Sequence, residues 1–522
     1  MKKLSLCMIV KNEEKNLPVC LKHIKKAVDE IIIVDTGSTD HTVEVAKKFG
    51  AKVYSFEWCD DFSAARNESL KHATGDYIIW LDADDRMRKA EVKKLIKLKK
   101  RFPAKKNVAY VLKIINVRES FVESCYQMRI FPNLPELRFE GMVHEQISFA
   151  ALRLGLKTEF VDIEILHLGY STPERNKQKA ERNLHLLLKE LRRRSNCWIT
   201  HFFLGQTYKF LKERKKAIFH YKKAIVSECR ETNKFIYIAA GINLASLLKE
   251  EGEKEEALKI LLKLTEEFPE NDVVKFFLGQ FYLFENDYER ALNALITVNP
   301  KNLHLVVVPI PYKLIKFKYY FGLATCYENL GYLKLAKDAY EKSLKFFEDN
   351  KDSQFLARLG IFYFKIRDFD KAKEFLNKAI SIAHNGLKAS LHHLLGQILM
   401  KIGERKEAKE HFEAALPYIS DGKVLPGLML AYLYVEECEL EKCIEVTEKI
   451  MKALKMPVNL ILNNFLDLIA LYVQIGAVCK ERKQKEEMFW SLKIAQKLSN
   501  YWQVFSEHLS KNTDINNRLN YE

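Results

Sequence analysis

The feature that most constrains this chain is a change of hydrophobic periodicity about a third of the way along it. Up to about residue 170, short apolar runs alternate with amphipathic helical segments, whereas the rest of the sequence contains no convincing strand run and repeats one helical signature. A chain of 522 residues is also too long for one ordinary core. The two periodicities predict two architectures in series, an α/β domain followed by an all-α array.

The helical signature is a leucine and a small residue, then a tyrosine or leucine three residues later and an alanine nine further on. It is clearest at Leu204-Gly205, Tyr208 and Ala217, and its period is near the 34 residues of the tetratricopeptide repeat. Further copies begin at Leu244-Ala245, Leu278-Gly279, Leu323-Ala324, Leu359-Gly360, Leu395-Gly396 and Leu430-Ala431. This part of the chain resembles tetratricopeptide proteins, and we predict a solenoid of that type over residues 197–522.

The first part of the chain has the pattern of a layered α/β domain. Four apolar runs predict strands at Leu4–Val10, Glu30–Val34, Val53–Trp58 and Tyr77–Leu81. Segments with helical spacing separate them, at Leu17–Val28, His41–Phe49 and Phe62–Ala73. This alternation predicts right-handed crossovers and a Rossmann-like, mostly parallel sheet with helices on both faces. We place this domain at residues 1–175 and a linking helix at residues 176–196.

Polar residues gather where the predicted strands end. The strand ends run into Lys11-Asn12-Glu13-Glu14, Asp35-Thr36-Gly37-Ser38-Thr39-Asp40, Trp58-Cys59-Asp60-Asp61 and Asp82-Ala83-Asp84-Asp85. The carboxyl ends of parallel strands share one edge of a sheet, and open α/β sheets bind their ligands at that edge. The sequence therefore predicts a binding site there.

The D-x-D pair Asp82 and Asp84 is the strongest metal signal. If this segment is extended, the two carboxylates point the same way. They would then attract a hard divalent ion, Mg²⁺ or Mn²⁺, which also takes oxygen ligands from a substrate diphosphate. The alternative is an acidic turn in which Asp85 caps a helix that begins at Arg86.

A second candidate is Asp35, which follows a buried run and precedes Thr36-Gly37-Ser38. Its carboxylate can accept a hydrogen bond from a nucleobase N–H, and the helix that follows favours negative charge at its N-terminus. An ordinary strand–turn–helix with Ser38 or Asp40 as the cap is compatible with this role.

Taken together, these motifs resemble family 2 glycosyltransferases of the GT-A fold. The resemblance rests on MIVKNEE, IIIVDTGSTD, ARN, ATGDYIIWLDADD and EGMVHEQI. It is closer to the subgroup with C-terminal tetratricopeptide repeats, which includes peptide S-glycosyltransferases. It implies that Asp35 contacts uracil or another base, that Asp82 lies against the ribose and that Asp84 binds the metal. It also implies that Arg66 helps to hold the nucleotide and that three residues lie near the nucleoside: Asn12, Glu13 and Glu14. A surface ion pair is the alternative for Arg66.

The segments after the D-x-D contain candidates for the remaining chemistry. An inverting transfer needs one base for the acceptor proton, and Glu145 is the first candidate and Glu140 the second. His144 and His167 could each complete the metal shell, or each could be a structural histidine. Arg129 could steady the diphosphate or pair with a surface carboxylate.

These residues predict a metal-dependent, inverting glycosyltransferase that uses a nucleoside-diphosphate sugar, UDP-linked in our interpretation. Tetratricopeptide arrays present concave surfaces that bind peptides, which favours a peptide or protein acceptor. A cell-surface glycan is the alternative acceptor, and a protein-interaction scaffold with an inactive enzyme domain is the rival function. A nucleotidyltransferase is disfavoured because the first strand is not followed by a glycine-rich phosphate loop.

The composition of the chain indicates its cellular compartment and the kinds of partner that it binds. No run of about 18 uncharged apolar residues occurs, and the scattered cysteines form no C-x-x-C pair, so we predict a cytoplasmic protein with reduced cysteines. The net charge is +16, and its densest basic segment is Lys93–Lys106. We interpret this segment as a solvated helix face, with peripheral contact to anionic lipid as the alternative. No nucleic-acid module is evident, and a homodimer stays open.

Overall fold

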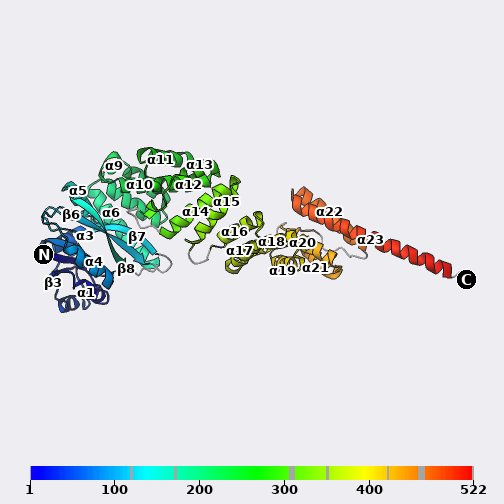
Figure 1. Cartoon of the computed structure of the whole chain (residues 1–522), viewed down its shortest axis with the longest axis horizontal. Coiled ribbons are helices and arrows are strands. Elements are labelled where there is room, and N and C mark those ends of the chain that lie inside the picture. The colour runs from blue at the N-terminus through cyan, green and yellow to red at the C-terminus, as the bar shows by residue number, and fades with distance from the viewer. Residues whose placement is uncertain are drawn as a thin grey trace. The chain divides into compact units, whose positions relative to one another are not determined.

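The computed structural model of the chain describes residues 2–117, 122–169, 173–304, 312–347, 352–419, 423–456 and 465–519. It divides into two compact units, residues 1–347 and 348–522. The first unit contains a sheet domain and helix pairs as far as α15 (Leu333–Leu344), and the second contains the remaining helix pairs (Figure 1).

The sheet has eight strands in the order β3-β2-β1-β4-β7-β6-β8-β5. Their bounds are β1 Leu4–Val10, β2 Glu30–Asp35, β3 Lys52–Ser55, β4 Tyr77–Trp80, β5 Asp85–Arg86, β6 Val108–Val117, β7 Val122–Pro132 and β8 Lys157–His167. The first four strands along the chain pair in parallel. Strand β7 is antiparallel to β4 and β6, and β8 is parallel to β6. The carboxyl ends of β1, β2, β4 and β8 therefore lie at the same edge.

Helices cover both faces of the sheet. Four of them are α1 Leu17–Ile24, α2 Thr42–Lys48, α3 Phe62–Lys71 and α4 Lys89–Lys99. Leu21 of α1, Ala46 of α2 and Leu95 of α4 share one buried cluster with side chains from one face of the sheet. Leu70 of α3 packs into a second cluster with side chains that point to the other face, among them Trp80. The predicted strand–helix alternation is thus confirmed, and the predicted strand at Val53–Trp58 is shorter and begins one residue earlier.

The second half of the sheet was not anticipated as strands. No strand was predicted after the D-x-D, yet this part of the chain forms the long strands β6, β7 and β8 with one short helix, α5 (Ser148–Arg153). Strand β7 returns the chain beside β4, so the sheet continues past its parallel half.

Helix α6 (Pro173–Arg193) follows the sheet domain, where the linking helix was predicted at residues 176–196. The hairpins that come next are α7/α8 (Trp198–Phe210, Arg214–Ala224), α10/α11 (Lys234–Glu250, Lys254–Glu267), α12/α13 (Asp272–Phe284, Tyr288–Ile296), α14/α15 (Tyr312–Asn329, Leu333–Leu344), α16/α17 (Ser353–Lys365, Phe369–Ile382), α18/α19 (Asn385–Ile402, Arg405–Ala415) and α20/α21 (Leu425–Glu436, Leu440–Ala453). Short or terminal helices complete the chain: α9 (Ser227–Thr232), α22 (Phe465–Glu481) and α23 (Lys485–Leu519).

Small residues do allow the paired helices to approach closely. A Cβ added at Gly205 would lie 2.8 Å from the ring of Tyr221, and one at Gly396 would lie 2.6 Å from the ring of Phe412. The glycine of the first helix therefore lies against an aromatic ring of the second helix of the same hairpin, whereas the aromatic residues were expected to pack toward the next hairpin. The all-α solenoid of tetratricopeptide type is confirmed.

Across the described part of the chain, no helix combines the length and the apolar character that a bilayer crossing requires. The basic segment at residues 93–106 begins on α4, and Lys93 and Lys97 of this helix and Lys100 directly after it are exposed.

Candidate active site

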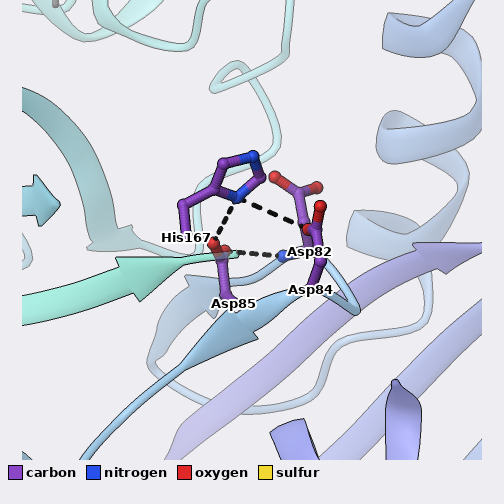
Figure 2. A group of neighbouring side chains, drawn as sticks. All are labelled: Asp82, Asp84, Asp85 and His167. Atoms are coloured by element: carbon purple, nitrogen blue, oxygen red, sulfur yellow. Dashed lines mark hydrogen bonds and ion pairs between the residues drawn. The ribbon is translucent and has the colours of Figure 1, made fainter. Parts of the chain in front are cut away.

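Three carboxylates and one imidazole meet at the carboxyl edge of the sheet. Asp82 and Asp84 lie between β4 and β5, Asp85 is the first residue of β5, and His167 is the last residue of β8 (Figure 2). One ligand atom from each of the four lies within 4.8 Å of the others. Strand order explains the meeting, because β5 pairs with the end of β8 and brings Asp85 opposite His167.

The turn differs from the extended D-x-D of the prediction. The backbone amide of Asp85 donates to the carbonyl of Asp82 at 3.0 Å, and the amide of Asp82 donates to the Asp85 carboxylate at 2.9 Å. The alternative interpretation of Asp85 as a helix cap is wrong, because Asp85 begins β5 and helix α4 starts at Lys89 with Arg88 as its N-cap.

Asp85 is the buried anchor of the cluster. Its side chain is fully buried, with Oδ2 3.0 Å from Nη1 of Arg129 and Oδ1 2.9 Å from Nδ1 of His167. Burial would lower the pKa of His167, but the bond to Asp85 and the charges of the three aspartates raise it. This role of Asp85 was not predicted, although a third aspartate directly after the D-x-D is visible in the sequence.

Two arginines flank Trp80, the last residue of β4. The guanidinium carbon of Arg129 lies 3.6 Å from the Trp80 ring centroid, and that of Arg66 lies 4.3 Å from it. Both arginines are almost completely buried. Stacking on an aromatic face favours a desolvated cation, so Trp80 helps to keep two positive charges beside the carboxylates. Trp80 was not among the predicted site residues.

Arg66 joins Asp82 to Glu145. Its Nη2 lies 2.8 Å from Oδ1 of Asp82, and its Nε lies 2.5 Å from Oε1 of Glu145. Burial would raise the pKa of Asp82, but Arg66 and Arg129 hold it well below its usual range. Arg66 Nη1 is buried and has no hydrogen-bond partner among the described residues. The alternative of a surface ion pair does not describe this arginine, since its side chain is 7% exposed.

Among the three carboxylates of the cluster, that of Asp84 has the least positive charge close to it. It contacts Nδ1 of His167 at 3.4 Å and, among the described residues, forms no ion pair with an arginine or lysine. Burial raises its pKa; His167 opposes this shift, and the neighbouring Asp82 and Asp85 add to it. Carboxylate oxygens with surplus negative charge suit a hard divalent ion such as Mg²⁺ or Mn²⁺, so the three aspartates of the cluster fit such an ion.

The loops after β1 and β2 are bound to each other. Asn12 Oδ1 accepts from the amide of Thr39 at 2.8 Å, and Glu14 Oε2 accepts from the amide of His41 at 3.1 Å. The amide of Glu13 donates to Thr42 Oγ1 at 2.7 Å. These contacts place Asn12, Glu13 and Glu14 beside the helix that follows β2.

Asp35 lies at the end of β2 and is buried. Its carboxylate accepts hydrogen bonds from the amides of Gly37 and Ser38 at 3.2 Å and 3.1 Å. Gly37 has a φ of 97°, which suits glycine, so Asp35 closes a tight turn at the edge where a nucleobase is predicted.

Two predicted residues lie apart from the cluster. Glu140 pairs with Arg153 of α5, and His144 stacks on Phe203 of α7 with ring centroids 4.4 Å apart. His144 is therefore not brought to the carboxylates that His167 contacts.

The fold and the site define an α/β enzyme domain with its candidate active site at the carboxyl edge of the sheet, joined to a helical repeat array. Residues 5–153 match the family model described as glycosyl transferase family 2. Tetratricopeptide repeat models match residues 200–225, 239–271, 317–350, 353–385 and 389–416. The chain therefore carries a glycosyl transferase family 2 domain at its N-terminus, with tetratricopeptide repeats behind it.

Several known proteins are similar to parts of this chain. A TPR repeat-containing protein of Synechococcus elongatus is 35% identical over 195 residues, which cover 35% of this chain and 48%, about half, of that protein. The SPbeta prophage-derived glycosyltransferase SunS of Bacillus subtilis is 29% identical over 302 residues, which cover 55% of this chain and 68% of that protein. Among solved structures, YrrB, described as a TPR protein with an unusual peptide-binding site, is 20% identical with a TM-score of 0.29 and covers 40% of this chain and 96% of that chain.

Proposed function

We propose that this protein transfers a sugar from a nucleoside-diphosphate sugar, with UDP as the nucleotide, to a peptide or protein acceptor, and that it inverts the anomeric carbon. The observation that carries the proposal is the cluster of Asp82, Asp84, Asp85 and His167 at the edge where open α/β sheets bind ligands. The family supports sugar transfer, and the repeat array supports a peptide acceptor, since such arrays offer extended concave surfaces.

Asp84, Asp82 and His167 would hold the divalent ion, which supplies neutralising charge to the leaving diphosphate. The buried Arg66 and Arg129 add positive charge beside Asp82 and Asp85. Arg66 Nη1 is an unsatisfied donor, so we assign it a diphosphate oxygen, and Arg129 holds Asp85 and the Trp80 ring in place. Asn12, Glu13, Glu14 and Asp35 form the edge where the nucleoside would lie.

In the transfer itself, an acceptor oxygen or sulfur attacks the anomeric carbon from the face opposite the diphosphate. The bond from that carbon to the diphosphate oxygen breaks, and its electron pair leaves with the diphosphate. The acceptor proton passes to Glu145. Arg66 contacts Oε1 of Glu145, so we assign the proton to Oε2.

Incubation of the purified protein with a panel of UDP-sugars and Mn²⁺ tests the proposal. We expect slow hydrolysis of at least one donor, and transfer of that sugar to a host peptide detectable by mass spectrometry. Hydrolysis with no peptide product but with a labelled glycan would support the cell-surface acceptor. No binding or hydrolysis of any nucleotide sugar would contradict the enzyme assignment and favour the scaffold.

A further inference from the structure

The loop that carries Glu145 is a small closed structure. Glu140 and Gln146 form an antiparallel bridge, with the amide of each donating to the carbonyl of the other at 3.0 Å and 2.9 Å. Inside the bridge, Gly141 has a φ of 99° and His144 a φ of 57°. A left-handed histidine is uncommon, so the surrounding contacts must hold this backbone in place. We call residues 140–146 the Glu145 loop.

One side of the Glu145 loop is held by helix α3 of the sheet domain. The amide of Phe62 donates to the carbonyl of Met142 at 2.9 Å, and Ser63 Oγ donates to the carbonyl of Gly141 at 2.6 Å. Arg66, on the same helix, holds the Glu145 carboxylate and Asp82 together. Helix α3 therefore connects the Glu145 loop to Asp82, where we propose that the sugar donor binds.

The other side of the loop is held by helices that follow the sheet domain. Glu190 of α6 accepts a hydrogen bond from the amide of Met142 at 3.4 Å. Phe203 of α7, the first helix of the repeats, stacks on His144 with ring centroids 4.4 Å apart and ring planes 13° from parallel. Because His144 directly precedes Glu145, this stack fixes the backbone from which the proposed base projects.

From these contacts we infer that Phe203 is a positioning residue for the transfer reaction, so that the first repeat helix completes the active site. The inference rests on the proposed function, in which Glu145 takes the acceptor proton. A continuous series of contacts runs from Phe203 through His144 and Glu145 to Arg66 and Asp82. The stack is not sealed inside the core, since part of the surface of His144 and of Phe203 is accessible to solvent.

The test compares Phe203→Leu with Phe210→Leu in the full chain. Phe210 lies on the same helix, is 52% exposed and serves as the matched control. We expect Phe203→Leu to lower kcat for peptide transfer at least tenfold while KM for the donor and Mn²⁺ affinity stay unchanged, because a small misplacement of a reacting group is costly. Phe203→Tyr keeps the stack and should retain the rate, as should Phe210→Leu.

A double-mutant cycle with His144→Ala separates a specific stack from general loosening. If the stack acts as a unit, Phe203→Leu together with His144→Ala should lower kcat no further than either change alone. Fully additive losses, or a folded Phe203→Leu protein with unchanged kcat, would overturn the inference.

Hydrogen exchange of the Glu145 loop gives a readout that does not need turnover. Amides of residues 142–146 should exchange faster in Phe203→Leu and be unchanged in Phe210→Leu; equal exchange in both would overturn the inference. Absence of any turnover by the wild-type protein would instead contradict the proposed function, whatever the exchange shows. If Phe203→Leu fails to fold, His144→Ala alone, outside the repeats, carries the same predictions.

Discussion

The carboxylate of Asp85 lies 2.9 Å from Nδ1 of His167, although 82 residues separate them in the chain. This contact joins the turn after β4 to the end of β8 and closes the acidic cluster on its buried side. Asp85 also neutralises Arg129, which stacks on Trp80. The geometry of the site therefore depends on a carboxylate that is fully buried and not available to solvent.

Asp85→Asn should destabilise the sheet domain by about 3–5 kcal/mol, because it removes the nearer carboxylate partner of the buried Arg129 and leaves only Asp82, at 3.7 Å. Thermal or denaturant unfolding of the full chain measures the change. Asp162→Asn is the matched control, since the side chain of Asp162 is 90% exposed and its pairing with Lys94 should contribute little. Equal stability of the two variants would contradict the anchoring role.

Acid should weaken the fold through Glu30, at the opposite end of β2 from Asp35. Burial alone would raise the pKa of Glu30, but hydrogen bonds from Ser5, Thr74 and Lys52 lower it to about 2. Below its ordinary pKa of 4.5 the unfolded chain binds the proton more readily. The stabilisation is therefore complete above about pH 4.5, and it is lost as the pH falls toward 2.

The size of this contribution is on the order of 1–3 kcal/mol. Glu30→Gln should lower stability at pH 7 and show a smaller further loss between pH 5 and pH 3 than the wild type, measured by denaturant titration at each pH. Parallel curves of stability against pH for the two proteins over that interval would rule out Glu30 as the source of the acid sensitivity.

In the second unit, Gly360 packs against the second helix of its hairpin. A Cβ at Gly360 would lie 2.5 Å from Cγ of Leu376 and 3.2 Å from the carbonyl oxygen of Ala372. We expect Gly360→Ala to destabilise by about 1–3 kcal/mol through overpacking. Gly386→Ala, with nothing within 4 Å of the added Cβ, should change stability by less than about 0.5 kcal/mol. An unchanged melt for Gly360→Ala would refute the repeat register.

The parallel half of the sheet and the repeats could be predicted because their signals are local. The run at Leu4–Val10 is continuous and apolar, and it forms β1 with the same bounds. The pairs of leucine and a small residue recur at a period near 34 residues, with insertions, and the glycines among them lie where helices touch. In both cases the residues that define the element are neighbours in the sequence.

The other features of the sheet and of the candidate site depend on contacts between residues that are distant in the chain. Asp85 became a strand residue because β5 pairs with β8, and a helix cap was an equally good local interpretation. Glu145 pairs with Arg66, which is 79 residues away in the chain. His144 lies outside the acidic cluster, and it stacks instead on Phe203 of another element. Periodicity and motif spacing carry no information about such contacts.

The most direct test of the central claim is a calorimetric titration of UDP into the wild-type protein and Asp84→Asn, each with Mn²⁺ and with EDTA. Asp84 lies at the cluster, and its carboxylate has no arginine or lysine partner among the described residues, so its loss should affect the metal more than the fold. We predict that UDP binds the wild type with Mn²⁺, that EDTA weakens this binding strongly, and that fresh Mn²⁺ restores it. Asp84→Asn should bind weakly in both conditions, with Asp162→Asn behaving as the wild type. Equal UDP affinity with Mn²⁺ and with EDTA, or full Mn²⁺-dependent binding by Asp84→Asn, would contradict a metal-dependent nucleotide-sugar site at the carboxyl edge of the sheet.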